Sequence, residues 1–167
     1  MRHRLFIAAA LFLFPTGFDG CPLASIEVDV SEVCVSRDVE VGASDGASAS
    51  ASFTVDDFGK LGTLAGQDSE AQFTSVRFPD LRAQLTSARA AVASGNPDVT
   101  LPTIEVACNG NCSDLAVPAQ LEADAVDYIR SGSITVELEL AGQLPTEAWT
   151  AKVDVCMTGT FATSVGD

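Results

Sequence analysis

Apolar and polar residues alternate with a period of two over long stretches of this 167-residue chain, and this alternation restricts the fold more than any other feature. From residue 149 to residue 161, apolar side chains recur at alternate positions, with mostly polar residues between them. Successive side chains of a strand point to opposite faces, so the pattern predicts a long strand with one buried face. Residues 134–140 alternate in the same way. Because the short segment 142–145 separates the two stretches, they are predicted to pair as an antiparallel hairpin.

A similar alternation runs through residues 26–30 and resumes at residues 33–35 with the opposite parity. An extra residue in a strand causes such a slip, so the sequence predicts a β-bulge near Ser31 and Glu32. Weaker strand patterns occupy three further segments: 49–55, 73–78 and 99–108. Pro102 interrupts the last of these and belongs at a sheet edge or a bend, since proline has no backbone N–H for a ladder.

Three other segments have helical, mixed or low-complexity patterns. Residues 80–93 are rich in Ala, Leu, Arg and Gln, which favours a helix, whereas alternating apolar residues near their start favour a strand, so both alternatives stay open. Residues 122–130 carry apolar side chains at helical spacing and precede Gly132, a typical residue after a helix end, so they predict a short helix. The stretch 42–52, rich in Gly, Ala and Ser, is predicted to be a mobile loop.

The number of predicted strands and the chain length together predict one all-β domain. Six or more short, mainly antiparallel strands with one or two short helices are typical of a two-sheet β-sandwich. The composition, 47% apolar and 19% charged, is that of a folded domain. The net charge of −14 comes from nine Lys and Arg against 23 Asp and Glu. It excludes nucleic acid as the main partner, because a surface that binds phosphates needs many basic residues.

The N-terminus has the organisation of a secretory signal peptide. Arg2 and Arg4 precede ten consecutive apolar residues, Leu5–Phe14, and a Pro-Thr-Gly sequence then breaks the segment. This run is shorter than the about 20 residues that a membrane-spanning helix needs. The expected boundaries are a signal peptide at 1–20 and a single β-sandwich domain at 21–167, with a short tether at 21–25.

The end of this leader, Gly17-Phe18-Asp19-Gly20-Cys21, resembles the signal of bacterial lipoproteins, in which a small residue precedes a cysteine that is acylated and becomes the new N-terminus. The resemblance implies lipidation of Cys21. The alternative is an ordinary signal that leaves Cys21 as a free thiol or a disulfide partner. Asp127–Gly132, leading into Ile134–Glu137, look like the C-terminal hairpin of small uncharacterised bacterial lipoproteins with a β-sandwich domain. Such proteins have no established activity, so the resemblance carries over no catalytic residue.

The resemblance implies an exported envelope protein with a structural, adhesive or binding role. Its partner would be the lipid bilayer, through the acyl anchor, at the outer membrane or the cell surface. Without the anchor, the protein would be periplasmic or extracellular. A protein or glycan ligand is compatible with this role, and the sequence does not identify it. Two alternatives from other classes stay open: a calcium-dependent or carbohydrate-binding module, and a histidine-free hydrolase that uses carboxylates.

If Cys21 is acylated, four cysteines remain, an even number that suits an oxidising compartment. Cys34 and Cys156 each stand between apolar residues of an alternating stretch and so point to the opposite face of a strand, which suggests a cross-strand disulfide. Cys108 and Cys112 flank an Asn-Gly turn signal, which suggests a local disulfide. A zinc site is disfavoured, because the paired C-x2-C spacing typical of four-cysteine sites is missing.

The sequence lacks the common catalytic motifs. Its histidine, His3, lies in the expected leader, so the exported protein would have no Ser-His-Asp or Cys-His arrangement and no histidine metal ligand. No G-x-S-x-G, P-loop or G-x-G-x-x-G segment occurs. Asp57-Phe58-Gly59 matches the kinase metal-binding triplet by chance, because the other kinase segments are missing. We therefore expect no enzymatic activity, no catalytic residue, no metal ligand and no cofactor.

Acidic residues are the remaining candidates for chemistry. Glu137 and Glu139 share a strand face that alternation places in solvent. Calcium prefers carboxylate and carbonyl oxygens from loops, and residues 109–114 and 68–70 could supply some of them, although no EF-hand pattern occurs. A carboxylate hydrolase would need two such groups held at a defined separation in a cleft.

Sugar binding would use exposed aromatic rings. Besides the phenylalanines, the candidates are Trp149 and Tyr128. The position of Trp149 in the alternating pattern is that of a buried residue. Connecting segments vary more freely than sheets, so we expect the functional residues in three loops: 42–49, 57–71 and 109–118.

Overall fold

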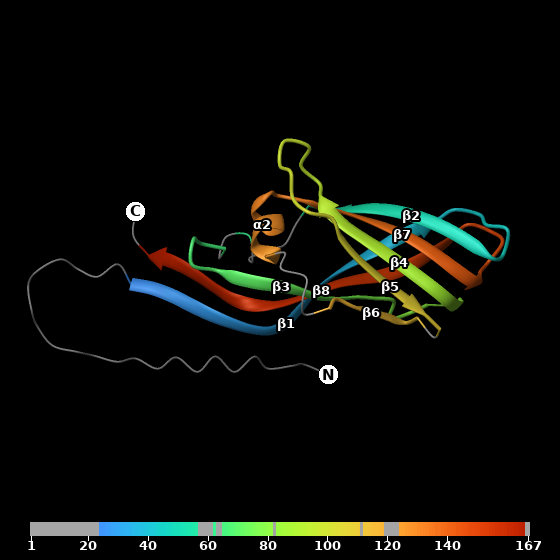
Figure 1. The fold of residues 1–167 in the computed structure, drawn as a ribbon, viewed down its shortest axis with the longest axis horizontal. Coiled ribbons are helices and arrows are strands. Elements are labelled where there is room, and N and C mark those ends of the chain that lie inside the picture. The colour runs from blue at the N-terminus through green and yellow to red at the C-terminus, as the bar shows by residue number, and fades with distance from the viewer. Residues whose placement is uncertain are drawn as a thin grey trace, which may run out of the picture.

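The computed structural model of the protein describes residues 24–56, 62, 65–81, 83–110, 112–118 and 124–165. These residues form two four-stranded antiparallel sheets that pack against each other, as Figure 1 shows. Sheet A has the order β1 (Ala24–Val41), β8 (Trp149–Val165), β3 (Glu70–Arg77), β6 (Asp114–Ala116). Sheet B has the order β2 (Ser48–Val55), β7 (Ile134–Gln143), β4 (Gln84–Ser94), β5 (Ile104–Asn109). The predicted all-β, two-sheet sandwich is confirmed, together with a short helix, α2 (Ala125–Arg130).

The core lies between the two sheets and is built from alternate residues of each. In β7 the inward side chains are at most 2% exposed: Ile134, Val136, Leu138 and Leu140. Glu137 and Glu139, which lie between them, are exposed as predicted. The inward side chains of β8 from Ala151 to Met157 are at most 1% exposed. Full burial of one aliphatic side chain contributes about 1.5–3 kcal/mol, so the two alternating strands are a major source of stability.

The predicted hairpin of the segments 134–140 and 149–161 is wrong. β7 pairs with β2 and β4 in sheet B, whereas β8 pairs with β1 and β3 in sheet A. The connection after Gln143 therefore crosses from one sheet to the other. Alternation shows that one face of each strand is buried. Two strands show the same alternation whether they are neighbours in one sheet or lie in opposite sheets with their apolar faces meeting in the core. The pattern therefore does not identify the partner of a strand.

The ambiguous segment 80–93 is largely strand. β4 begins at Gln84 and lies inside sheet B, between β7 and β5. Its alanines contribute to the core, with Ala88 and Ala90 at most 3% exposed. Pairing on both sides satisfies the backbone of β4, and this tertiary context outweighs the helical preference of Ala, Leu and Arg.

The predicted mobile loop 42–52 is only partly a loop. β2 begins at Ser48, and its Ala and Ser residues alternate between a half-buried inner face and an exposed outer face. The turn before it is ordered by Asp45, whose carboxylate accepts hydrogen bonds from the amides of Ala47 and Ser48, each at 2.9 Å. This turn is therefore part of the folded structure.

Several local predictions are confirmed, although some elements begin at other residues than predicted. The β1–β8 register shifts between Val30 and Val33, which confirms the bulge. β5 begins at Ile104, so Pro102 precedes this strand and does not interrupt it. The short strand β6 was not predicted, because its three residues include one buried side chain, Leu115, and show no alternation to detect.

The predicted helix is confirmed over part of its length. α2 covers residues 125–130, whereas residues 122 and 123 lie outside the described part of the chain. The carboxylate of Asp124 accepts a hydrogen bond from the Val126 amide at 2.9 Å and caps the helix. The same carboxylate accepts a hydrogen bond from the Ala71 amide of β3 at 3.1 Å, so it also fastens the helix to sheet A. Gly132, with φ of +92°, follows the helix end as expected.

Candidate functional site

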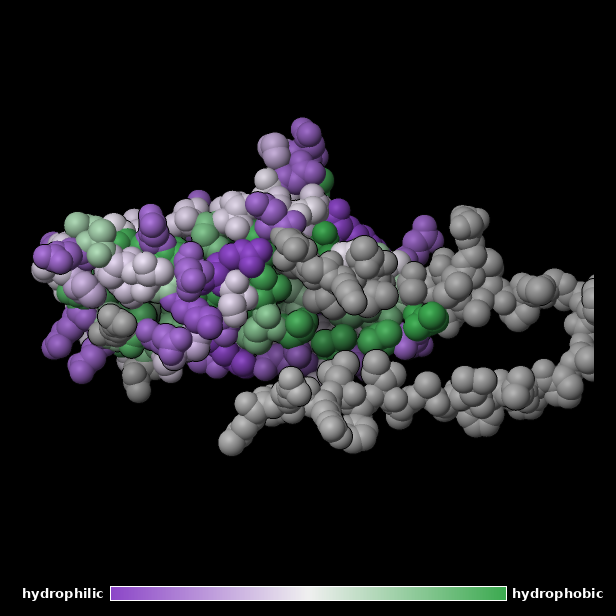
Figure 2. Space-filling model, turned by 180° about the vertical axis from the view of Figure 1, so that it is seen from behind, coloured by the Kyte–Doolittle hydropathy of each residue, from purple (hydrophilic) through white to green (hydrophobic). Residues whose placement is uncertain are grey.

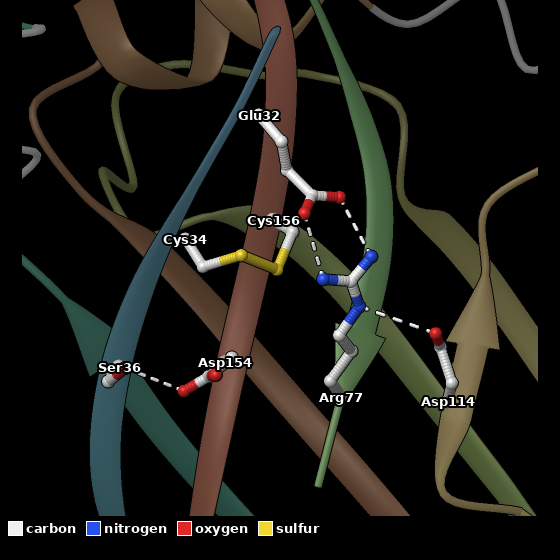
Figure 3. The surroundings of a disulfide bond; sticks show 7 residues. All are labelled: Glu32, Cys34, Ser36, Arg77, Asp114, Asp154 and Cys156. Carbon is white, nitrogen blue, oxygen red and sulfur yellow. Dashed lines mark hydrogen bonds and ion pairs between the residues drawn. A yellow bond between two sulfur atoms is a disulfide. The ribbon is translucent and has the colours of Figure 1, made fainter. Parts of the chain in front are cut away.

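A disulfide lies on the outer face of sheet A, the face that points away from the core. Cys34 of β1 and Cys156 of β8 are directly opposite each other, with their Cα atoms 4.0 Å apart (Figure 3). The predicted pairing is confirmed. The bond joins β1 and β8, the first and last strands among the described residues, across a sequence separation of 122 residues.

Arg77 of β3 reaches across β8 to Glu32 of β1 (Figure 3). Its Nη1 and Nη2 donate to the two oxygens of the Glu32 carboxylate at 2.9 and 2.7 Å, and its Nε donates to Asp114 of β6 at 3.3 Å. Hydrogen bonding from Arg77 lowers the pKa of Glu32. The ion pair crosses β8 beside Cys156, which is 0% exposed although its side chain points away from the core.

The second predicted disulfide is also confirmed. Cys108 of β5 bonds to Cys112, which lies two residues before β6, with 5.7 Å between their Cα atoms. Gly110, in the turn between them, has φ of +118°, a conformation that favours glycine. Since β5 belongs to sheet B and β6 to sheet A, this short disulfide holds a point where the chain passes from one sheet to the other.

The segments considered for calcium have other interactions. In residues 109–114, the carboxylate of Asp114 is already paired with Arg77. In residues 68–70, the side chain of Ser69 is buried and donates a hydrogen bond to the carbonyl of Ala162 at 3.2 Å, so this segment is fastened to β8. Within the described ranges, no three His, Cys, Asp or Glu side chains are grouped so that they could hold a metal ion.

A hollow with a volume of about 910 Å³ lies over the outer face of sheet B. One row of its lining crosses all four strands: Ser50 of β2, Glu139 of β7, Arg89 of β4 and Ala107 of β5. The turn before β2 and small side chains of the neighbouring rows complete the wall. The hollow thus combines hydroxyl and amide groups with a central charged group, and none of the described residues that line it is aromatic.

Arg89 is held between two carboxylates at this hollow. Its Nη2 lies 2.7 Å from Glu105, and its Nη1 lies 3.3 Å from Glu139. Hydrogen bonds to these two groups raise the pKa of Arg89, and hydrogen bonding from Arg89 lowers the pKa of Glu105. All three side chains are at least 43% exposed, so water screens the attraction and the pairs contribute little to stability.

The two aromatic candidates for sugar binding differ in exposure: Tyr128 is buried, whereas Trp149 is partly exposed and lines two hollows of the surface. Tyr128 is 1% exposed, donates a hydrogen bond to the carbonyl of Pro102 and packs edge to face against Phe73 at a ring separation of 5.4 Å. Burial raises the pKa of its hydroxyl group. Trp149 is half-buried against the core, as its parity predicts, and its indole nitrogen is buried without a hydrogen-bond partner.

An apolar strip along β1 was not predicted as a surface feature. Ile26 is 51% exposed and Val28 is 37% exposed, and the strip continues with partly buried valines at positions 30, 33 and 35. Figure 2 shows the strip as a band of green atoms along the lower side of the molecule. Alternation predicted the inward parity of these residues but does not show how much of this face is covered, and Ile26 and Val28 are left exposed.

The expected lipidation site lies outside the described residues, as do the rest of the leader and Asp57. β1 begins at Ala24, so the end of the segment 21–25, expected to be a tether, already belongs to sheet A. Among the described residues, no helix has both the length and the apolar character needed to span a membrane.

Comparisons with protein-family models and with curated proteins found no match to this chain.

Proposed function

We propose that the chain is an exported envelope protein, anchored by a lipid on Cys21, whose β-sandwich has a binding, adhesive or structural role and no enzymatic activity. The observation that carries this proposal is the Cys34–Cys156 disulfide, which joins the first strand to the last. Disulfides persist in oxidising compartments and are rare in the cytosol, and the N-terminal leader supplies the route of export.

The pKa shifts of the described carboxyl groups give no support to acid catalysis. A catalytic acid that works near neutral pH needs a carboxyl group with a raised pKa. Among the described residues, three carboxyl groups have a clearly shifted pKa, and all three are lowered: Glu32, Asp45 and Glu105. Hydrogen bonds from Arg side chains or backbone amides keep these groups ionised. Their role is to hold neighbouring strands and turns in place.

Intact-mass spectrometry of the protein purified from an export-competent bacterial host tests the proposal. We expect an N-terminus at Cys21, an added acyl mass and four oxidised cysteines. The Cys21→Ser variant should lose the acyl mass and keep both disulfides. An unlipidated N-terminus at a later residue would contradict the anchor, and four reduced cysteines in the native protein would contradict export.

The hollow on sheet B favours carbohydrate binding as a second candidate function. Its serine hydroxyls, the Asn109 amide and the Glu139 carboxylate are hydrogen-bonding groups that suit a polyhydroxylated ligand. A glycan array probed with the wild-type protein and with the Arg89→Ala variant tests this candidate. The matched control is Arg77→Ala, which removes an arginine from the outer face of sheet A. Binding that is lost only in the Arg89 variant would support the candidate, and no glycan binding by the wild-type protein would exclude it.

A further inference from the structure

The side of β1 that faces away from β8 forms an edge of sheet A. The order of sheet A places β1 at its edge, with β8 on one side. Among the described residues, no strand pairs with the other side of the segment Ala24–Val30. A strand edge with unpaired N–H and C=O groups is a template on which another strand can form.

The later part of the same edge is protected against such pairing. The bulge between Val30 and Val33 interrupts the edge. Arg37 is paired with Val153 and so has the parity of the core, which puts a charge where an added strand would bury an apolar residue. Bulges and inward charges are two of the features by which proteins protect exposed strand edges.

The segment Ala24–Val30 has neither of these features. Its inward side chains include Ile26 and Val28, which are 51% and 37% exposed. Strands in proteins are usually about 5–6 residues long, so this segment offers the length of one ordinary strand. An added strand would satisfy the free backbone groups and cover the exposed apolar side chains.

The outward side chains of the segment define the charge of the partner. Glu27 and Asp29 are exposed on the outer face, and the chain as a whole carries a net charge of −14. Opposite charges on directly opposed strand residues are stabilising. We propose that the edge Ala24–Val30 binds an extended polypeptide segment in which apolar residues alternate with Lys or Arg, and that this segment adds a strand to sheet A. The proposal rests on the binding role given above but not on the acyl anchor.

A second copy of the chain fits this edge poorly. Antiparallel pairing of two copies about Val28 would set Glu27 of each copy opposite Asp29 of the other. Like charges directly opposed across strands are destabilising, and the two copies would also repel each other through their net charges.

A bilayer also fits less well. Hydrocarbon offers no partner for the free backbone groups of an edge strand, so inserting this edge into lipid would leave them unsatisfied. A peptide strand satisfies them and covers Ile26 and Val28 at the same time.

Synthetic nonapeptides test the proposal on the protein purified after export of the full-length chain. The probe alternates Val and Lys, and two comparison peptides replace Lys by Glu or carry N-methylated backbone amides. We expect the Val/Lys peptide to bind at least about tenfold more tightly than either comparison, a difference of about 1.4 kcal/mol. Fluorescence anisotropy measures the affinity. Hydrogen exchange should slow in residues 24–30 when the peptide is bound.

A pair of protein variants locates the site. Val28→Lys places an inward charge on the free segment, as Arg37 does further along, and should weaken binding of the Val/Lys peptide by about tenfold or more. The matched control is Thr54→Lys, which adds the same charge to an exposed position on β2, the edge strand of sheet B, and should leave binding unchanged. If Val28→Lys fails to fold, the three peptides still decide the question on the wild-type protein.

Four results would overturn the proposal. They are equal binding of all three peptides, binding of none, protection of residues 24–30 through dimerisation alone, and protection of these residues by phosphatidylglycerol vesicles but not by peptide. Because acylation of Cys21 is measured separately by mass, a failure here leaves the anchor untouched, and a missing anchor leaves the peptide result untouched.

Discussion

Gly142 of β7 lies so close to β4 that a β-carbon on this residue would overlap the carbonyl oxygen of Gln84. Its φ of +151° is also a conformation that residues with a side chain rarely adopt. The close approach occurs where the β4–β7 register shifts, between Leu85 and Ser87. The packing of these two neighbouring strands therefore requires glycine at position 142.

The Gly142→Ala variant should be destabilised because its methyl group has no room beside Gln84. We expect the free energy of unfolding to fall by about 1–3 kcal/mol, as for other overpacked sites. Urea denaturation measures the loss. Gly42→Ala is the control, since a β-carbon at Gly42 meets nothing within 4 Å. Equal stability of the two variants would show that β4 moves aside without cost.

The two disulfides should differ in their contribution to stability. The Cys34–Cys156 bond spans 122 residues, and the Cys108–Cys112 bond spans four. In the chain-entropy model, these loops correspond to about 5 and about 2 kcal/mol. We therefore expect the double variant Cys34→Ala/Cys156→Ala to lose more stability than Cys108→Ala/Cys112→Ala in urea denaturation. The reverse order would mean that local packing, rather than loop closure, dominates.

The Glu32–Arg77 pair should make stability depend on acid pH. Arg77 holds the pKa of Glu32 below its ordinary value of 4.5 in the folded protein, so the unfolded chain takes up the proton first as the pH falls. The contribution of Glu32 to stability is complete above about pH 4.5 and is lost as the pH falls through the lower folded-state pKa. The difference in urea midpoint between the wild-type protein and Glu32→Gln should therefore shrink from neutral pH to about pH 3. Glu137→Gln, on the other sheet, reports the effect of removing a negative charge alone. A difference that stays constant with pH would contradict this role of Arg77.

Truncation of apolar residues should separate the core from the β1 strip. Leu138 is 1% exposed, so Leu138→Ala should cost about 2–5 kcal/mol through lost burial and a residual cavity. Val28 is 37% exposed, so Val28→Ala should change the free energy of unfolding by only about 0.5 kcal/mol. Thermal or urea denaturation measures both. A large loss at Val28 would mean that this residue belongs to the core.

The fold class could be predicted because alternation and cysteine parity are local properties. The period of two in residues 149–161 indicates a strand in any sandwich, and the parity of Cys34 and Cys156 places both sulfurs on an outer face. Strand partners could not be predicted, because alternation is the same for a neighbour in the sheet and for a strand across the core. This is why the hairpin prediction failed.

The ion pairs of Arg77 with Glu32 and Asp114 on sheet A could not be predicted from the sequence, for a related reason. Arg77 is 45 residues from Glu32 and 37 from Asp114, and these distances along the chain carry no signal of contact. The functional residues were expected in loops, and two of these loops, 42–49 and 109–118, contribute to the lining of the hollow, whereas the rest of its lining is a sheet face and the β1 strip lies on an edge. The part of a strand that the other sheet covers depends on the topology of the whole domain. Alternation alone does not determine this topology.

The Cys34–Cys156 disulfide also limits how much of β1 a pulling force can detach from β8. Tension that enters the domain at Ala24 acts on the β1–β8 ladder, whose first pair is Ala24 with Val165. Strand β1 can detach only up to Cys34, because the covalent bond to Cys156 carries the load beyond that point. Residues 24–33 are already extended in the strand, so at about 3.3 Å per residue their free end stays within roughly 33 Å of Cys34 after they detach. In the lipid-anchored protein proposed above, a pulling force at the N-terminus would thus detach only the part of β1 that precedes Cys34 before the load passes through the disulfide to β8.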